Sequence, residues 1–185
     1  KTMISSPNLT ETVADRIKLP LTFDAEKMLA EVTALQLQDF VYYDVLSLRS
    51  PAHFVDPSRP IPPPAADYAD GSWTDWLDTK ALQQSLYLSS VVDTFKAHTK
   101  VTLVRLLRLS AGSVVAEHTD PTLGLQIKKS VIRLTIPILV NDKVTFYLND
   151  RPVPMLPGEC WYLRLTDPHR ITNEGHTERI NMSID

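Results

Sequence analysis

The chain has 185 residues, enough to bury a full core, and its 43% hydrophobic and 22% charged content is ordinary for a globular protein. Its net charge of −3, with no basic block, does not support a nucleic-acid partner. Its apolar stretches have the length of strands, so none indicates a membrane span of about 20 residues. The start shows no signal-peptide pattern, and the single Cys160 excludes an internal disulfide, so we expect a reducing cytoplasm.

The first hundred residues predict two helices between short strands and irregular chain. Residues 19–23 are typical of a strand. Asp24 is expected to cap a helix over 25–37, in which apolar residues recur at helical spacing. Residues 41–48 are rich in β-branched and aromatic side chains and indicate another strand. The second helix is expected over 85–97.

Residues 50–72 are rich in proline, which predicts little helix or strand in this segment. Long ordered loops in compact domains often serve as lids or binding loops. We therefore expect this segment to be either a lid over a pocket or a packed irregular wrap. Two aromatic residues, Trp73 and Trp76, follow it directly.

From residue 101 onward the pattern changes to short strands separated by turn residues. Many short strands at regular spacing favour a β-sandwich or barrel. We expect an α+β, mainly β, fold in one domain (1–185), with a helical and irregular part (1–100) before a β core (101–185). The strands are predicted at 101–109, 113–118, 130–139, 143–148, 159–164, 169–173 and 178–184.

The motif His118-Thr119-Asp120 indicates a metal site. Strand side chains alternate, so the imidazole and the carboxylate lie on one face. The later His169 would complete a set of two histidines and one carboxylate, which leaves open positions on non-haem Fe(II). Arg179 would supply a fixed positive charge for an anionic co-substrate.

With five histidines and 22 acidic residues in the chain, one histidine two positions before an acidic residue is expected by chance. The chain contains a second such pair, His176 and Glu178. We favour His118 and Asp120 because they follow a predicted strand and precede a polar loop. Ordinary alternatives remain: a loop pair that caps the strand, a strand histidine bonded to a carbonyl, and a salt bridge for Arg179. Zinc is a rival metal, although no helical HExxH motif is present.

Several segments of the chain form a recognisable set: 104–113 (VRLLRLSAGS), 117–120 (EHTD), 132–138 (IRLTIPI), 158–163 (GECWYL), 169–173 (HRITN) with Arg179 and Ile180, and also 19–24 and 46–50. In sequence and order they resemble the aspartyl/asparaginyl β-hydroxylase family, including its bacterial members. That family belongs to the Fe(II)- and 2-oxoglutarate-dependent dioxygenases, whose core is a double-stranded β-helix, also called a jelly-roll and similar to cupins.

The resemblance implies a hydroxylase that oxidises an unactivated C–H bond while 2-oxoglutarate and O₂ yield succinate and CO₂. It implies that His118, Asp120 and His169 bind iron and that Arg179 holds the distal carboxylate of 2-oxoglutarate. A planar guanidinium suits that role better than lysine would. The remaining implied contacts are an acidic group at Arg133 and a co-substrate contact from Thr135, which stands where many members carry a histidine.

The expected substrate is small and amino-acid-like, free or tethered to a carrier, or an Asp/Asn-type residue of a peptide. We expect Arg105, Arg133 and Arg164 to recognise its carboxylate, and Asn173 to orient a ligand histidine. Two alternatives remain, namely a non-catalytic jelly-roll binding module and a cupin-type metalloenzyme that does not use 2-oxoglutarate. The aromatic residues that would line the pocket, with core packing as their alternative, are Trp73, Trp76, Tyr42 and Trp161.

Overall fold

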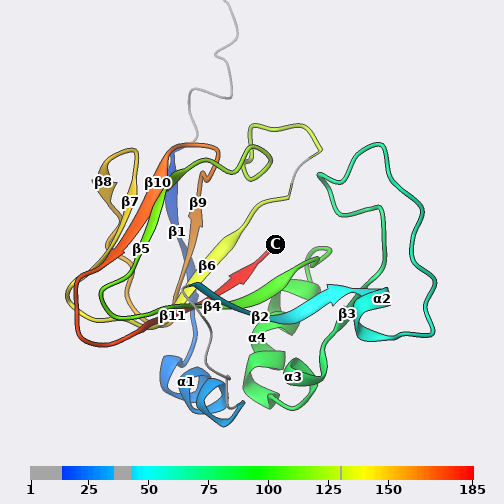
Figure 1. The fold of residues 1–185 in the computed structure, drawn as a ribbon, viewed down its shortest axis with the longest axis horizontal. Helices are drawn as coiled ribbons and strands as arrows, with labels where there is room; N and C mark the ends of the chain where they lie inside the picture. The colour runs from blue at the N-terminus through cyan, green and yellow to red at the C-terminus, as the bar shows by residue number, and fades with distance from the viewer. Residues whose placement is uncertain (1–13, 36–42, 130) are drawn as a thin grey trace, which may run out of the picture.

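The computed structural model describes residues 14–35, 43–129 and 131–185, which form two antiparallel sheets and four helices (Figure 1). The helices are α1 (Ala25–Ala34), α2 (Ala52–Val55), α3 (Lys80–Gln83) and α4 (Leu86–Lys96). The strands are β1 (Arg16–Thr22), β2 (Tyr43–Pro51), β3 (Trp76–Asp78), β4 (Val104–Leu109), β5 (Val114–His118), β6 (Leu134–Leu139), β7 (Val144–Leu148), β8 (Arg151–Pro152), β9 (Glu159–Leu163), β10 (His169–Asn173) and β11 (Arg179–Ile184).

The larger sheet has seven strands in the order β1-β9-β6-β11-β4-β2-β3, and the smaller has four in the order β5-β10-β7-β8. The strand pairs are antiparallel. The first hundred residues therefore contribute strands β1, β2 and β3 to the large sheet, in addition to helices. The predicted class, α+β and mainly β with N-terminal helices, is confirmed.

Helices cover one face of the large sheet, as Figure 1 shows below the strands. Helix α1 begins where expected, because the Asp24 side chain accepts a hydrogen bond from the backbone N–H of Lys27 at 3.1 Å. Helix α4 buries Leu88, Val91, Val92 and Phe95 at helical spacing. These apolar faces pack on strand residues in a first hydrophobic core that includes Leu106, Ile136, Ile180 and Met182.

A second hydrophobic core lies on the other face of the large sheet, between the two sheets. Leu109 and Leu163 enter it from the large sheet, and Phe146, Leu148 and Ile171 from the small one. By alternation, strands β4 and β9 of the large sheet serve both cores, for example through Leu106 and Leu109 in β4. Polar side chains interrupt this second core at one place, and they form the site described below.

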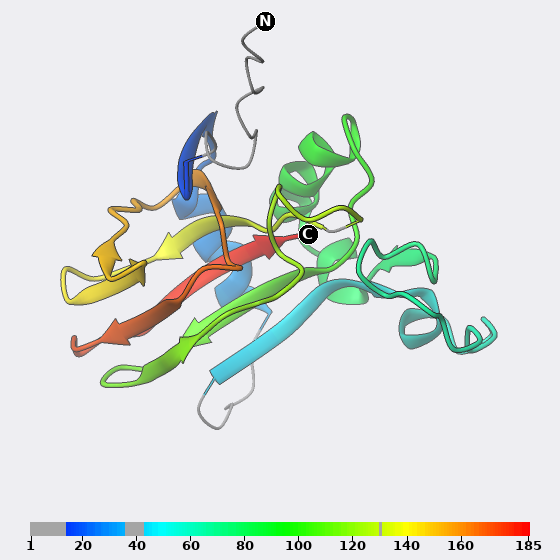
Figure 2. The same ribbon diagram turned by 90° about the horizontal axis from the view of Figure 1, so that it is seen from above.

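The proline-rich segment is more regular at its start than predicted. Strand β2 continues to Pro51 and the four-residue helix α2 follows, so the expectation of irregular chain from residue 50 was wrong for 50–55. Pro51 is tolerated because it lies at a strand end and at a helix N-cap. Residues 56–75 contain no helix or strand, and Figure 2 shows this connection extending past β2 and β3.

The remaining differences concern short elements and element ends: α1 ends at Ala34 and not at residue 37, and β4 begins at Val104 and not at residue 101. The sequence did not predict β3, α3 or β8, which have two to four residues each. Strand β6 begins at Leu134, later than the predicted residue 130, which lies outside the described residues. Over the part of the chain that the structure describes, no helix has the length and apolar character needed to cross a membrane.

Candidate metal centre

Strands β5 and β10 bring the two predicted histidines together. His118 and His169 are register partners in this antiparallel pair, and their ring centroids lie 4.2 Å apart. Asp120 follows the end of β5, and its Oδ2 lies 3.0 Å from His169 Nε2 and 3.7 Å from His118 Nε2. One ligand atom from each of the three residues lies within 4.8 Å of the other two. The described side chains thus form the group that the sequence predicted.

Backbone carbonyls fix the orientation of both imidazoles. His118 Nδ1 lies 2.8 Å from the carbonyl oxygen of Ala116, and His169 Nδ1 lies 2.9 Å from that of Asp167. A carbonyl only accepts hydrogen bonds, so each Nδ1 carries the proton and donates it. In the neutral rings the lone pairs of both Nε2 atoms are then left for a metal, which is the usual arrangement around a ligand histidine.

Asn173 does not orient either histidine, contrary to expectation. Its Nδ2 donates to the carbonyl oxygens of Leu109, Ser110 and Thr177, so it holds the β10–β11 turn against the end of β4. The sequence placed Asn173 on the right strand, but the backbone itself supplies the partners of the imidazoles.

The carboxylate of Asp120 is held in its anionic form. Without a metal ion, a His169 ring that carries both protons donates from Nε2 to Asp120 and lowers the pKa of this carboxyl from its usual value. Positive charge on His169, His118 and Arg133 acts in the same direction, against partial burial. The backbone N–H of Asp120 donates to the carbonyl of Leu165 at 2.8 Å, which fixes the loop after β5. An anionic oxygen beside two neutral nitrogens is a suitable set of ligands for a divalent cation.

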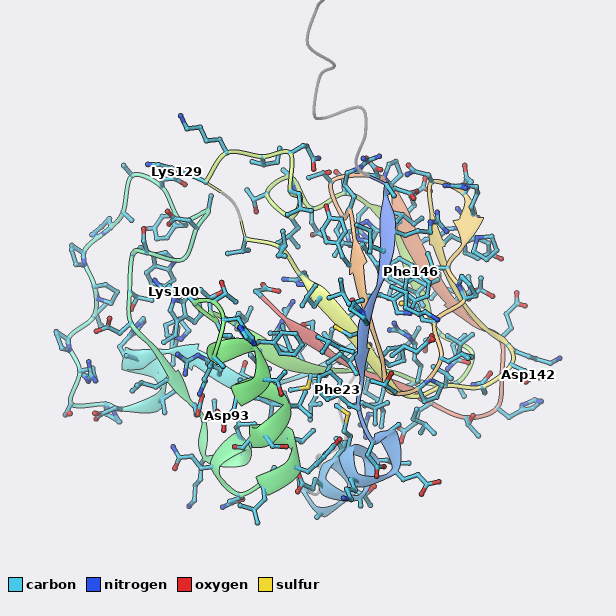
Figure 3. The ribbon with its side chains drawn as sticks, turned by 180° about the vertical axis from the view of Figure 1, so that it is seen from behind. Phe23, Asp93, Lys100, Lys129, Asp142 and Phe146 are labelled. Carbon is cyan, nitrogen blue, oxygen red and sulfur yellow. The ribbon has the colours of Figure 1, made fainter. Side chains whose placement is uncertain are left out.

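A cavity of about 60 Å³ joins these ligands to the predicted co-substrate residues. Arg179, only 3% exposed, enters it from β11, and its Nη1 donates to Asn181 Oδ1 at 2.7 Å. Phe146, labelled in Figure 3, closes another side, and its ring is stacked at 4° on that of His169. The structure therefore gathers in one cavity His118, Asp120, His169, Arg179, Arg133 and Thr135.

Arg133 is engaged by an acidic side chain that the sequence analysis missed. Its Nε donates to Asp185 Oδ1 at 2.7 Å and its Nη2 to Asp185 Oδ2 at 2.9 Å. Asp185 lies 52 positions away, and a strand-end aspartate carries no local pattern that marks it as a partner of an arginine. Asn181 and Ser183 were also missed, although alternation from Arg179 along β11 would have placed them in the same cavity.

A second pocket, of about 280 Å³, adjoins the metal cavity and shares Asp120 and Arg133 with it. Trp73 and Trp76 line it, with ring centroids 5.8 Å apart and planes at 78°. Tyr68 packs edge-on against Trp73 at 5.3 Å. The end of the proline-rich connection thus provides an aromatic wall beside the proposed metal ligands.

The other predicted substrate residues lie elsewhere. Arg105 on β4 is the register partner of Ser183, which lines the metal cavity, but Arg105 itself does not line it. Arg164 lies outside both pockets, and its Nε donates to Asp167 at 2.8 Å. Trp161 packs in the second hydrophobic core, as its alternative reading held, and Tyr42 lies outside the described residues. Glu178, the acid of the second His-x-acid pair, forms a salt bridge with Arg108 at 3.6 Å and therefore has a structural role.

Comparison with known proteins relates the chain to one sequence family. The sequence profile described as aspartyl/asparaginyl β-hydroxylase matches residues 72–185. No curated protein sequence matches the chain.

Three solved structures show the same overall fold. A 2OG-Fe(II) oxygenase family oxidoreductase from Burkholderia pseudomallei is 16% identical, with a TM-score of 0.52 over 92% of this chain and 82% of that one. The viral collagen prolyl hydroxylase of Paramecium bursaria Chlorella virus-1 is 8% identical, with a TM-score of 0.53 over 96% and 97% of the two chains. The non-heme alpha-ketoglutarate-dependent carbocyclase SnoK is 11% identical, with a TM-score of 0.52 over 97% and 85%. The jelly-roll architecture expected from the sequence is thereby confirmed.

Proposed function

The chain belongs to the aspartyl/asparaginyl β-hydroxylase family, and from this premise we propose that it is an Fe(II)- and 2-oxoglutarate-dependent hydroxylase acting on an amino-acid-like substrate. One observation carries the proposal: three ligand atoms within 4.8 Å of one another border a cavity that also contains the buried Arg179. Neither feature alone has this implication, because a metal site needs no arginine and a buried arginine needs no metal.

The donor set fits Fe(II). Two imidazole nitrogens and one carboxylate oxygen are the facial set that leaves positions open for co-substrate and O₂. The fixed Nδ1 atoms of His118 and His169 direct both Nε2 atoms toward Asp120, so the site needs little rearrangement to bind the ion. In this proposal His118, Asp120 and His169 hold the iron.

The positive charge in the cavity suits a dicarboxylate. The guanidinium of Arg179 is always charged and lies in a nearly dry environment, where a carboxylate partner is strongly favoured. We assign to Arg179 the distal carboxylate of 2-oxoglutarate. Thr135, 5% exposed in the same cavity, contributes a hydroxyl that contacts the co-substrate without adding charge.

With iron and 2-oxoglutarate bound, O₂ would be the oxidant: one of its oxygen atoms would enter succinate as CO₂ is released, and the other would hydroxylate the substrate. The residues of the chain position and shield the reactants. Phe146 and the second core exclude water from one side of the cavity. On another side, Asp120 and Arg133 line both this cavity and the adjoining aromatic pocket. A substrate held in that pocket lies directly beside the metal ligands.

We assign the substrate to the pocket lined by Trp73 and Trp76. Its aromatic wall suits an apolar side chain, and the paired charges of Arg133 and Asp185 offer one donor group and one acceptor group. This combination is suited to an amino-acid-like molecule rather than to a strongly charged one. Arg105, one row away on β4, is the remaining candidate for contact with a substrate carboxylate.

The test is succinate formation from 2-oxoglutarate with Fe(II) and ascorbate, screened over free amino acids and short Asp- or Asn-containing peptides. We expect turnover stimulated by at least one amino acid. If 2-oxoglutarate neither binds nor turns over, the hydroxylase proposal is wrong. Metal-dependent turnover of another substrate would then indicate a cupin-type enzyme, and ligand binding without turnover would indicate a binding module.

A further inference from the structure

We propose that Ser183 is a co-substrate-binding residue, whose Oγ donates a hydrogen bond to the metal-proximal carboxylate of 2-oxoglutarate. Thr135, beside it on β6, assists at the same end of the cavity. Arg179 would hold the opposite end of the molecule. This inference rests on the proposed function and deepens it, because it identifies the second anchor of the anionic co-substrate.

The hydroxyl of Ser183 is buried without a partner. The residue is 1% exposed, and its Oγ makes no hydrogen bond within the protein. Buried polar groups are nearly always satisfied, so an orphaned hydroxyl needs an explanation. Ser85 is the ordinary case: it is equally buried at 2%, but its Oγ donates to the carbonyl of Ala81 at 2.9 Å.

Strand geometry directs this hydroxyl into the metal cavity. Along β11, Ile180, Met182 and Ile184 belong to the first hydrophobic core, whereas Arg179, Asn181 and Ser183 line the cavity. The core side of the strand is thus entirely apolar and the cavity side entirely polar. A serine with only a structural role on this strand would have no need of its hydroxyl, since the adjacent buried positions are filled by apolar side chains.

The neighbours of Ser183 indicate an anion as its partner. Its register partners are Thr135 on β6 and Arg105 on β4, and Arg133 and Arg179 line the same cavity. Arg133 is already paired with Asp185, so the buried Arg179 is the charge in this cavity that favours a negatively charged guest. A hydroxyl can donate to a carboxylate oxygen of such a guest. The paired hydroxyls of Thr135 and Ser183 can each contribute one such hydrogen bond.

The spacing along β11 matches the length of a five-carbon diacid. The guanidinium of Arg179 reaches the side chain of Asn181 at 2.7 Å, and Asn181 lies two residues, or about 7 Å, before Ser183. The contact with Asn181 and the strand spacing together separate the guanidinium from Ser183 by about 10 Å. The four carbon–carbon bonds of 2-oxoglutarate span about 5 Å, and a hydrogen bond of about 2.8 Å at each end brings its reach to about 11 Å. A molecule anchored at Arg179 therefore reaches Ser183 with its other carboxylate.

The test compares Ser183→Ala with the matched control Ser85→Ala, each loaded with Fe(II) without oxygen and titrated with 2-oxoglutarate in a calorimeter. We expect Ser183→Ala to weaken 2-oxoglutarate binding about tenfold or more, the effect of one charge-assisted hydrogen bond. Its ligand-free melting temperature should equal or exceed that of the wild type, because an unsatisfied hydroxyl is removed. Ser85→Ala should show the reverse: a lower melting temperature and unchanged affinity.

A second titration, with 2-oxopentanoate, locates the contact, since this ligand keeps the metal-proximal keto acid but lacks the distal carboxylate. We expect Ser183→Ala to weaken both ligands equally, whereas Arg179→Met should weaken 2-oxoglutarate alone. Unchanged 2-oxoglutarate affinity in Ser183→Ala, with normal binding by the wild type, overturns the Ser183 assignment and leaves the hydroxylase proposal intact. A wild type that binds no 2-oxoglutarate overturns both.

Discussion

Arg133 and Asp185 form a two-point ion pair, with Nε–Oδ1 and Nη2–Oδ2 distances of 2.7 and 2.9 Å, at the junction of the metal cavity and the aromatic pocket. The sequence led us to expect Arg133 to bind an acidic group of co-substrate or substrate. The protein supplies such a group itself. An acidic substrate would have to displace a carboxylate that is 7% exposed, which costs the free energy of leaving it unpaired.

We first predict that Asp185→Asn destabilises the protein. The arginine is partly exposed, so we expect the free energy of unfolding to fall by about 2 kcal/mol, less than for a fully buried pair. Urea denaturation measures this change. Asp150→Asn is the matched control, because Asp150 also pairs with an arginine, Arg170, but is 82% exposed, and its loss should leave the free energy of unfolding nearly unchanged. Equal effects of the two substitutions would contradict a special role for the Arg133 pair.

The metal assignment predicts a difference between two histidines of similar sequence context. His118→Ala should reduce Fe(II) affinity at least 100-fold and should abolish hydroxylation. Loss of a residue that only hydrogen-bonds to a metal ligand usually reduces metal affinity by about 10- to 100-fold, and loss of the ligand itself should exceed that. His176→Ala changes the other His-x-acid pair, which lies outside the metal cavity, and should leave both properties unaltered. Anaerobic calorimetry with Fe(II) measures affinity, and product analysis measures turnover. Asp120→Ala should match His118→Ala; full activity in that variant would refute the ligand set.

The aromatic pocket predicts a separation of substrate binding from co-substrate turnover. Trp73→Ala removes a ring from the pocket wall and should raise the KM for the proposed amino-acid-like substrate about tenfold, because about 1.4 kcal/mol of apolar contact is lost. Substrate-independent conversion of 2-oxoglutarate to succinate should persist, since Trp73 does not line the metal cavity. Tyr147→Ala is a suitable control because Tyr147 packs on Arg170, away from both pockets. An unchanged KM in Trp73→Ala would place the substrate elsewhere.

Stability should depend on Asp15 in the acid range. Hydrogen bonds from Arg16 hold the pKa of this carboxyl well below its usual range, assisted by Asn149 and Arg151 and opposed by burial. A depressed folded pKa stabilises the protein above the unfolded value near 4, and that contribution is lost as pH falls through the folded pKa.

The corresponding experiment is urea denaturation of Asp15→Asn and wild type at several pH values. At pH 7 the variant should be less stable by about 1–2 kcal/mol, the scale of charge-assisted hydrogen bonds. This difference should shrink as the pH falls below about 4. Asp75→Asn, at a carboxyl that is 82% exposed, should show no comparable pH-dependent difference. A difference for Asp15→Asn that is constant with pH would mean that packing, and not charge, is responsible.

The sequence predicts the parts of this molecule that depend on local period. The His118 and Asp120 pair is visible as a spacing of two residues at a strand end, although Asp120 itself lies just beyond β5, and helix α4 is visible in its apolar spacing. Strand β3 and helix α3 escape such detection, since three or four residues do not complete a period. Contacts between residues far apart in the sequence are not predicted either. Arg133 and Asp185 meet because β6 and β11 are neighbours in the large sheet.

His118 lies on β5, the outermost strand of the small sheet, and faces His169 on β10, which is the one partner of β5 in the described part of the chain. A divalent ion bound by both would therefore act as a cross-link that fastens this edge strand to the rest of the protein. At an ion concentration 100 times the Kd, binding adds about 2.7 kcal/mol to the folded state. Chelation should then accelerate hydrogen exchange in β5 before any other strand, so that iron supply would control the local order of the enzyme as well as its chemistry.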